Sequence, residues 1–263
     1  MHPEILRIQS FVLHSYGLMV ALGFLAGLWI AGRLASETGI NGDKATSLGI
    51  YATVAAILGA KVLLLISDFS YYAANPREIF SMTTLQAGGI FFGGLVAALA
   101  TAAWYLRRED LPALRTADAF APGLAIGHAI GRGGCFLAGC CWGRTTGVPW
   151  AVTFTSDVAH DLVGVPLHVP LHPTQLYEAL AEAVIFVILW RRFRRPHAEG
   201  AILGLYLILY PAFRFVIEFY RERSANSFPF GGPVSITQYL AVLLVTAGAY
   251  LLLRSPKTRH ATS

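Results

Sequence analysis

Twenty consecutive residues, from Ala87 to Leu106, carry no charged side chain. An α-helix needs about 20 mostly apolar residues to cross the hydrocarbon core of a bilayer. Comparable runs recur along the chain, and we predict seven helices at about residues 11–32, 46–67, 87–106, 118–135, 174–190, 200–220 and 236–253. The sequence therefore predicts an all-α integral membrane protein with seven transmembrane helices and a small extracytoplasmic head.

Composition agrees with a membrane-embedded chain. Of the 263 residues 55% are hydrophobic and 13% are charged, whereas soluble domains have about 25% charged residues. We therefore expect residues 1–263 to form one polytopic domain, with the first apolar run retained as a helix. The net charge of +5 does not indicate nucleic-acid binding, because the basic residues fall at the ends of the apolar runs.

Basic residues in the loops predict the orientation of the chain. Loops that would be cytoplasmic hold twelve: Arg33, Lys44, Arg107, Arg108, Arg115, Arg191, Arg192, Arg194, Arg195, Arg254, Lys257 and Arg259. The opposite set holds five: Arg7, Arg77, Arg144, Arg221 and Arg223. Because cytoplasmic loops are enriched in Lys and Arg, the N-terminus is predicted outside and the C-terminus in the cytoplasm. Residues 144–173 then form an extracytoplasmic loop with a short strand at 149–154, either capping a site or serving as a connector.

Polar side chains within the predicted helices are the candidates for function, because a buried charge in a bilayer costs about 2.5–3.5 kcal/mol. They are Lys61, His128, Arg132, Glu178, Glu182, Arg214 and Glu218, with His14 and Tyr16 near the outer end of the first helix. Arg214, Glu218 and Arg221 share one helix face. Either Arg214 and Glu218 neutralise each other, or Arg132 and Arg214 converge on an anion such as a phosphate.

Pairs of glycines four residues apart predict close helix packing rather than chemistry. The pairs are Gly23/Gly27, Gly89/Gly93 and Gly127/Gly131. Small residues at this spacing let helices approach closely in lipid.

Five motifs, in order, carry a family resemblance. They are SYGLM at 15–19, FGGL at 92–95, GRGGCF at 131–136 with WGR at 142–144, HPTQLYE at 172–178, and FRFVIEF at 213–219 with Arg221. On these residues the chain resembles the prolipoprotein diacylglyceryl transferase family over nearly its whole length. The resemblance implies an enzyme of lipoprotein biogenesis in the bacterial inner membrane. Such an enzyme moves the diacylglyceryl group of phosphatidylglycerol to the lipobox cysteine of a prolipoprotein, so that a thioether forms and glycerol phosphate leaves.

The resemblance also implies roles for particular residues. Arg132 and Arg214 would hold the phosphate, Tyr16 would hydrogen-bond the headgroup, and Glu218 would orient Arg214. Gly143 would allow a close backbone approach. Further substrate contacts fall in the matched motifs at Gly93, Gly94, His172, Gln175 and Tyr177. The expected partners are phosphatidylglycerol, the signal peptide of a prolipoprotein and membrane lipid, without a metal or other cofactor and without nucleic acid.

The chain departs from the family pattern at three positions. Phe92 stands where many members have histidine, and Cys135 and Cys140 stand where many have asparagine and glutamate. With Cys141, the thiols have spacing i, i+5, i+6, which is not that of paired metal ligands. We expect small buried thiols, and a disulfide or a catalytic thiol are the alternatives.

The departure at position 92 leaves the proton acceptor open. Histidines predicted on the outer side are the candidates, and otherwise the phosphate itself takes the proton. The candidates are His14, His128, His160, His168 and His172.

Two other functions also stay open: a phospholipid-dependent transferase with another acceptor, and a non-catalytic homologue that binds or transports lipid. A transporter would favour polar sites at the midplane, whereas the polar residues here cluster toward the outer half.

Overall fold

The computed structural model describes residues 3–8, 11–81, 84, 89–222 and 234–254. Within them, seven helices of 17 residues or more each overlap one of the predicted segments. They are α1 (Ser15–Glu37), α2 (Gly42–Ser67), α5 (Phe91–Arg108), α6 (Ala113–Ala138), α8 (Thr174–Phe193), α9 (Ala201–Ile217) and α10 (Ile236–Arg254). The predominantly helical class is confirmed. Arg223, Lys257 and Arg259 of the charge comparison lie outside the described residues.

A hairpin precedes the first long helix. Strands β1 (Glu4–Ile8) and β2 (Phe11–His14) pair in antiparallel fashion, with Ile8 opposite Phe11. The prediction that the first helix begins at residue 11 is therefore wrong, because aromatic and β-branched residues at 11–14 suit a strand. The helix begins at Ser15, whose backbone N–H and side-chain Oγ both lie within hydrogen-bond distance of the Pro3 carbonyl, at 3.0 and 3.2 Å.

The chain forms two compact units, residues 1–34 with 117–263 and residues 35–116, and the boundaries fall within α1 and α6. In the first unit, α1 and α6 approach closely enough to require glycine. A Cβ atom on Gly23 would lie 2.6 Å from the Gly127 carbonyl oxygen, and one on Gly27 would lie 2.8 Å from that of Gly123. The packing role predicted for Gly23, Gly27 and Gly127 is confirmed. That of Gly131 is wrong, because a Cβ there would meet nothing within 4 Å.

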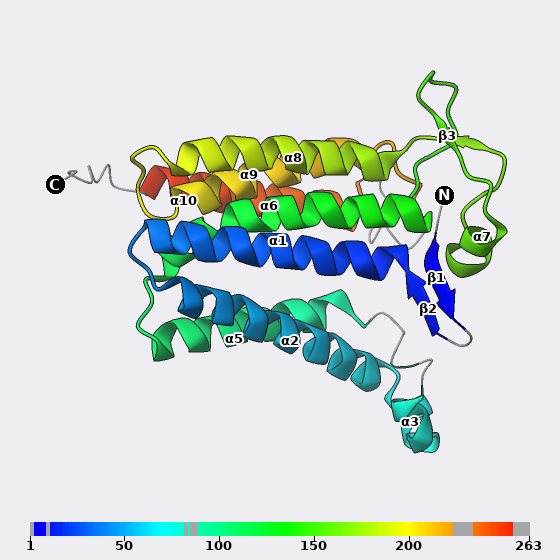
Figure 1. Cartoon of the computed structure of the whole chain (residues 1–263), viewed down its shortest axis with the longest axis horizontal. Helices are drawn as coiled ribbons and strands as arrows, with labels where there is room; N and C mark the ends of the chain where they lie inside the picture. Colours follow the sequence, from blue (N-terminus) through cyan, green and yellow to red (C-terminus); the bar gives the residue numbers. More distant parts are fainter. Residues whose placement is uncertain (1–2, 9–10, 82–83, 85–88, 223–233, 255–263) are drawn as a thin grey trace. The chain divides into compact units, whose positions relative to one another are not determined.

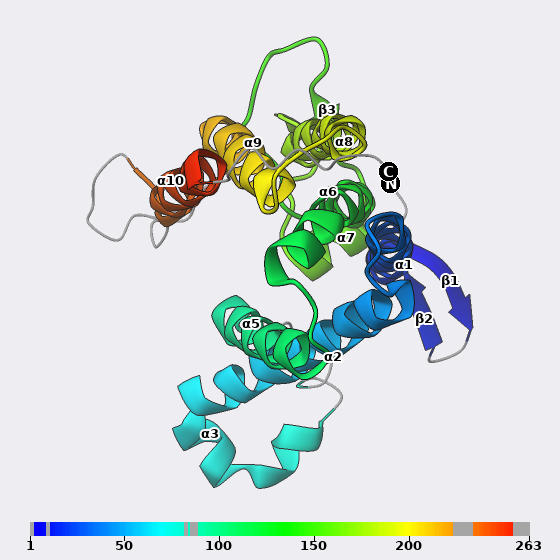
Figure 2. The same ribbon diagram turned by 90° about the vertical axis from the view of Figure 1, so that its left-hand side faces the viewer.

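The same unit contains α8, α9 and α10, with α9 contacting both of the others (Figures 1 and 2). Asp118 of α6 fixes the start of α9. Its carboxylate accepts hydrogen bonds from the backbone N–H groups of Gly200, at 2.7 Å, and Leu203, at 2.8 Å. The first N–H groups of a helix have no partner within the helix, so this carboxylate ties α9 to α6.

Residues 144–173 form a small packed head rather than a simple connector. It contains β3 (Val152–Thr153) and α7 (Asp157–Val163), both labelled in Figure 1, and β4 (Pro170–Leu171), which pairs with β3. Its core consists of Phe154, Ala159, Val165 and Leu171, all buried. The strand predicted at 149–154 is confirmed only for residues 152 and 153.

The second unit contains α2, α3 (Phe69–Ala74), the 3₁₀ helix η1 (Pro76–Phe80) and α5. A Cβ atom on Gly89 would lie 2.5 Å from the backbone of Ala60, and one on Gly93 would meet the Gly59 carbonyl oxygen. The predicted packing role of Gly89 and Gly93 is thereby confirmed. Lys61, a polar candidate to which the sequence assigned no specific role, donates through Nζ to the Thr84 carbonyl at 2.6 Å.

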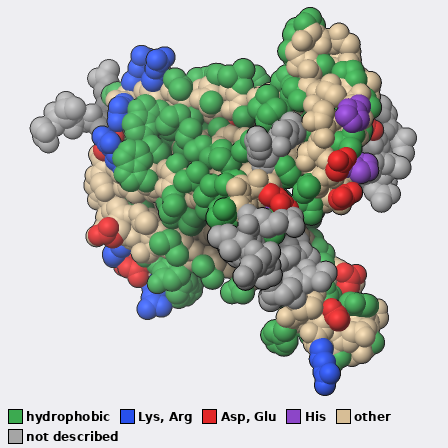
Figure 3. All heavy atoms as spheres, turned by 45° about the vertical axis from the view of Figure 1, so that its right-hand side comes forward, with side chains coloured by type: hydrophobic (Ala, Val, Ile, Leu, Met, Phe, Trp, Pro, Cys, Tyr) green, Lys and Arg blue, Asp and Glu red, His purple; other side chains and the backbone are tan. Residues whose placement is uncertain are grey.

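Three helices are long and apolar enough to cross a membrane by length and composition: α1, α2 and α10. Of the other long helices in the described residues, α5 ends in two arginines, α6 and α8 carry internal charges, and α9 is 17 residues long. Large apolar side chains are exposed on the helices, for example Trp29 of α1 at 63%, and Figure 3 shows hydrophobic side chains over much of the helical surface. These helices are compatible with a lipid environment.

Candidate active site

Glu178, in the first turns of α8, is the centre of a buried ion-pair cluster within the first unit. Its side chain is 3% exposed and pairs with the Nε of Arg132 from α6. Its Oε1 lies 3.1 Å from the Nε of Arg214 and 3.8 Å from the Nη1 of Arg221. Arg132 and Arg214, predicted from sequence to converge, are therefore brought together by a carboxylate whose role the sequence analysis missed.

A second carboxylate completes the cluster. Arg214 Nη1 lies 2.5 Å from Glu218 Oε2, one turn further along, where Glu218 caps the end of α9. The predicted Arg214–Glu218 pair exists, but it is not self-contained, because Arg214 also contacts Glu178. Three guanidinium groups face two carboxylates, so the cluster carries a net charge of +1 when all groups are ionised. A buried excess of positive charge is costly unless an anion neutralises it.

A second polar pair lies one helical turn away on the same two helices. His128 Nδ1 lies 2.6 Å from Glu182 Oε1, and Tyr206 of α9 donates to the same oxygen at 3.5 Å. His128 is four residues before Arg132, and Glu182 is four residues after Glu178, so both pairs join the same faces of α6 and α8. Among the five candidate histidines, His128 is thus the one with a carboxylate partner in the contacts described.

The backbone around Gly143 connects this cluster with the head. Its N–H donates to the His172 carbonyl at 2.9 Å. A Cβ atom on Gly143 would lie 2.6 Å from the Tyr220 carbonyl oxygen and 2.7 Å from that of His172. Only glycine fits here, because the obstructing atoms are backbone and have little freedom to move. The close approach at this position is thus between segments of the chain itself.

An aromatic group forms where α8 begins. His172 Nδ1 lies 3.1 Å from the Tyr177 hydroxyl, which accepts a hydrogen bond from Trp150 Nε1 at 2.7 Å. The ring of Tyr220 packs edge-on against both His172 and Tyr177. These contacts fix the two side chains of the HPTQLYE motif against each other and against the head.

The segment after α6 is held by the start of α8. Thr174 Oγ1 donates to the Cys141 carbonyl at 2.8 Å, and Gln175 Nε2 donates to the Cys140 carbonyl at 2.6 Å. Gln175 therefore supports the backbone of the site. Arg132 Nη1 lies 3.9 Å from Cys135 Sγ. The three cysteines are free thiols, so the disulfide alternative does not describe this structure.

The remaining predicted residues divide between the two units. Tyr16 is half-exposed in the first turn of α1, and its carbonyl oxygen would lie 3.5 Å from a Cβ on Gly134 of α6, two residues beyond Arg132. Phe92, Gly93 and Gly94 belong to the other unit. There Phe92 is half-exposed, and a Cβ on Gly94 would lie 2.8 Å from the Ala56 carbonyl oxygen of α2.

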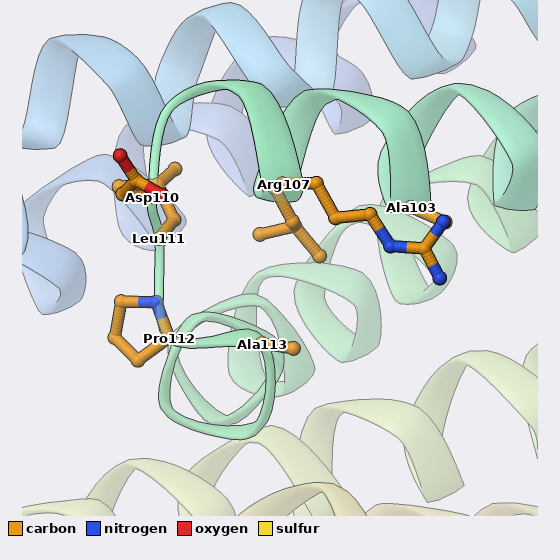
Figure 4. Close-up of a pocket in the computed structure, with 7 residues that line it drawn as sticks. Ala103, Arg107, Asp110, Leu111, Pro112 and Ala113 are labelled. Atoms are coloured by element: carbon orange, nitrogen blue, oxygen red, sulfur yellow. The ribbon is translucent and has the colours of Figure 1, made fainter.

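A hollow of about 610 Å³ lies at the turn between α5 and α6, within residues 103–113 of the second unit (Figure 4). It is lined mainly by alanine, leucine and proline, and the side chains of Arg107 and Asp110 do not point toward each other (Figure 4). It lacks the convergent polar groups expected of a site for chemistry. The ion-pair cluster is the stronger candidate.

Comparison with known proteins gives the same family in each case. The sequence profile of the family described as prolipoprotein diacylglyceryl transferase matches residues 3–254. A protein of Photobacterium profundum named phosphatidylglycerol–prolipoprotein diacylglyceryl transferase is 34% identical over 265 residues, covering 99% of this chain and 96% of its own. Proteins of the same name from Vibrio vulnificus and Serratia proteamaculans are also 34% identical. Both alignments cover 98% of this chain. They cover 93% of the Vibrio vulnificus protein and 94% of the Serratia proteamaculans protein.

Proposed function

The chain belongs to the prolipoprotein diacylglyceryl transferase family, and we propose that it transfers the diacylglyceryl group of phosphatidylglycerol to the cysteine thiol of a prolipoprotein. The observation that carries the proposal is the cluster around Glu178, in which three arginines face two carboxylates. One phosphodiester anion would neutralise the excess charge. Guanidinium groups match phosphate oxygens with paired donors.

The transfer is a substitution at a glycerol carbon. The thiolate of the acceptor cysteine forms a C–S bond, the C–O bond to phosphate breaks, and glycerol phosphate leaves with the electron pair. Arg132 and Arg214 would hold the phosphate oxygens as negative charge develops on the leaving group, which lowers the barrier. Glu178 and Glu218 position the two arginines, and Tyr16 hydrogen-bonds the headgroup.

His128 is the group that we propose as the proton acceptor. A thiol must lose its proton to become a strong nucleophile, and Phe92 cannot accept one. Glu182 contacts His128 Nδ1 at 2.6 Å and would orient the ring and stabilise its protonated form. Because His128 lies one turn before Arg132, the base and the phosphate site share a helix face.

Chemical rescue tests the base. We expect His128→Ala to lower the transfer rate about 10²–10⁴-fold, the usual contribution of general base catalysis, and added imidazole to restore part of it. The matched control is His197→Ala, because His197 is bonded through Nδ1 to the Arg195 carbonyl outside the cluster. Full activity of a folded His128→Ala protein would remove His128 from the mechanism, and a loss that imidazole leaves unchanged would make its role structural.

Purified protein tests the anion site. Phosphatidylglycerol in mixed micelles and a peptide with a lipobox cysteine are the substrates, and released glycerol phosphate is measured. Removing one donor to developing charge typically costs about 10²–10³-fold, so Arg214→Ala and Arg132→Ala should each lose at least that much. Arg107→Ala, an exposed arginine of the second unit, is the control. If folded Arg214→Ala releases glycerol phosphate at the unaltered rate, the phosphate assignment is wrong.

The topology forms part of the proposal. We place all seven long helices across the bacterial inner membrane, with the N-terminus and the 144–173 head outside and the C-terminus in the cytoplasm. The excess of basic residues in the alternate loops supports this orientation. Reporter fusions after residues 110, 160 and 197 should report cytoplasmic, extracytoplasmic and cytoplasmic locations in turn. The opposite pattern would contradict this topology, because it would place the head on the cytoplasmic side of the membrane.

A further inference from the structure

The three cysteines of the chain converge in space. Cys135 is buried near the end of α6, and Cys140 and Cys141 follow in the next turn, partly buried. All three Sγ atoms lie within 4.8 Å of one another. Among the described residues this is the one group of three or more side chains with metal-ligating atoms so close together.

The backbone that brings the thiols together is unusual. Gly139 and Cys141 both have positive φ angles, +80° and +60°, which turn the chain back toward the end of α6. A left-handed conformation is unfavourable for cysteine and persists only where its surroundings enforce it. Thr174 and Gln175 enforce it here, because they hold the carbonyls of Cys141 and Cys140. The strained turn is thus supported by a second segment of the chain.

A positively charged guanidinium group lies beside the cluster. Arg132 Nη1 lies 3.9 Å from Cys135 Sγ. Thiolates are the form that binds metal ions, so the cluster combines three donor atoms with a neighbouring positive charge.

We propose that Cys135, Cys140 and Cys141 form a three-thiolate binding site for a soft monovalent metal ion, Cu(I). A metal–sulfur distance of about 2.3 Å places three thiolates in a plane about 4 Å apart, so the Sγ atoms need to close by less than about 1 Å. Binding forms three Cu–S bonds and releases the proton of each bound thiol, and the copper stays in the Cu(I) state throughout.

Two other uses of the thiols fit the geometry less well. A disulfide needs two cysteines and gives no reason for the third to converge. Structural zinc sites almost always have four protein ligands, and the described cluster offers three. All-thiolate coordination with few ligands suits Cu(I). The inference from the spacing i, i+5, i+6 argued against a metal site because it assumed a regular backbone. The left-handed conformation of Cys141 instead places its thiol beside the other two.

Copper titration of the full-length protein tests the site. Reduced protein in detergent, under nitrogen, is titrated with Cu(I) against a chromophoric Cu(I) chelator while the ultraviolet thiolate-to-copper band is recorded. We expect one Cu(I) per chain with this band. Cys135→Ser, Cys140→Ser and Cys141→Ser should each weaken binding at least tenfold, and the triple variant should lose the band. All cysteines of the chain are in the cluster, so the band cannot arise elsewhere in it.

Two controls keep the result decisive. Elution volume and thermal unfolding show whether each serine variant is folded. Alkylation of the folded wild-type protein blocks the thiols without any substitution.

Failure of wild-type protein to compete with the chelator would overturn the proposal. So would equal affinity in any folded single variant, which would mark a two-thiol site. Cells quenched with an alkylating agent before lysis should show three free or metal-protected thiols per chain. Finding one would identify a disulfide and overturn the metal site.

Discussion

Replacing Glu178 by glutamine removes one carboxylate from the buried cluster, whose net charge then rises from +1 to +2. Three arginines lose a charged partner: Arg132, Arg214 and Arg221. Glutamine keeps the shape and one acceptor oxygen, so the change is chiefly electrostatic. Breaking a buried ion pair by removing one partner costs about 3–5 kcal/mol. At about 2–4 °C per kcal/mol for a chain of this size, the unfolding midpoint should fall by roughly 6–20 °C.

Thermal unfolding in detergent, with and without phosphatidylglycerol, measures the effect. The lipid should raise the unfolding midpoint of Glu178→Gln more than that of the unaltered protein, because its phosphate offsets the added positive charge. Asp161→Asn is the matched control. Its carboxylate is exposed in α7, so the change should stay within about 0.5 kcal/mol. If Glu178→Gln behaves like this control, with no added response to lipid, Glu178 is not the centre of the cluster.

Three further substitutions test the supporting structure. Gly143→Ala should lower both the unfolding midpoint and the transfer rate, because its Cβ would meet backbone oxygens at 2.6 and 2.7 Å. Gly147→Ala is the control and should be neutral, because a Cβ there would meet nothing within 4 Å. Equal effects of the two substitutions would contradict the close backbone packing around Gly143. Asp118→Ala leaves two backbone N–H groups at the start of α9 without their carboxylate partner. The free energy of unfolding should fall by about 1–3 kcal/mol for each N–H group, and hydrogen exchange at the start of α9 should become faster. Unchanged exchange would contradict the role of Asp118 in holding this helix end. Gly27→Leu should separate α1 from α6 and lower the yield of folded protein; a normal yield would argue against the close contact.

The sequence predicted the helices well because their apolar runs are long. It placed the start of α8 at Thr174 and offered the convergence of Arg132 and Arg214 as one of two alternatives. The N-terminal hairpin was missed because residues 11–14 continue the apolar run of α1. Strand pairing there depends on residues 4–8, and no helical periodicity reveals that partner.

The centre of the site was missed for a different reason. Glu178 appears in the sequence as one more intramembrane carboxylate, and its role arises only when α6, α8 and α9 bring three arginines to it. The same holds for the pair of His128 with Glu182, which are 54 residues apart in the chain. The convergence of the cysteines depends on the positive φ angle of Cys141, which no spacing rule anticipates.

The measurement that tests the central claim most directly is the mass of a reporter lipoprotein. A strain depleted of its own diacylglyceryl transferase would express this chain or its Arg214→Ala variant, each shown to be folded and inserted. We predict a diacylglyceryl adduct on the lipobox cysteine with the unaltered chain and none with the variant. An unmodified reporter with the unaltered chain would contradict the proposed transfer, and an adduct formed equally by Arg214→Ala would contradict the arginine site.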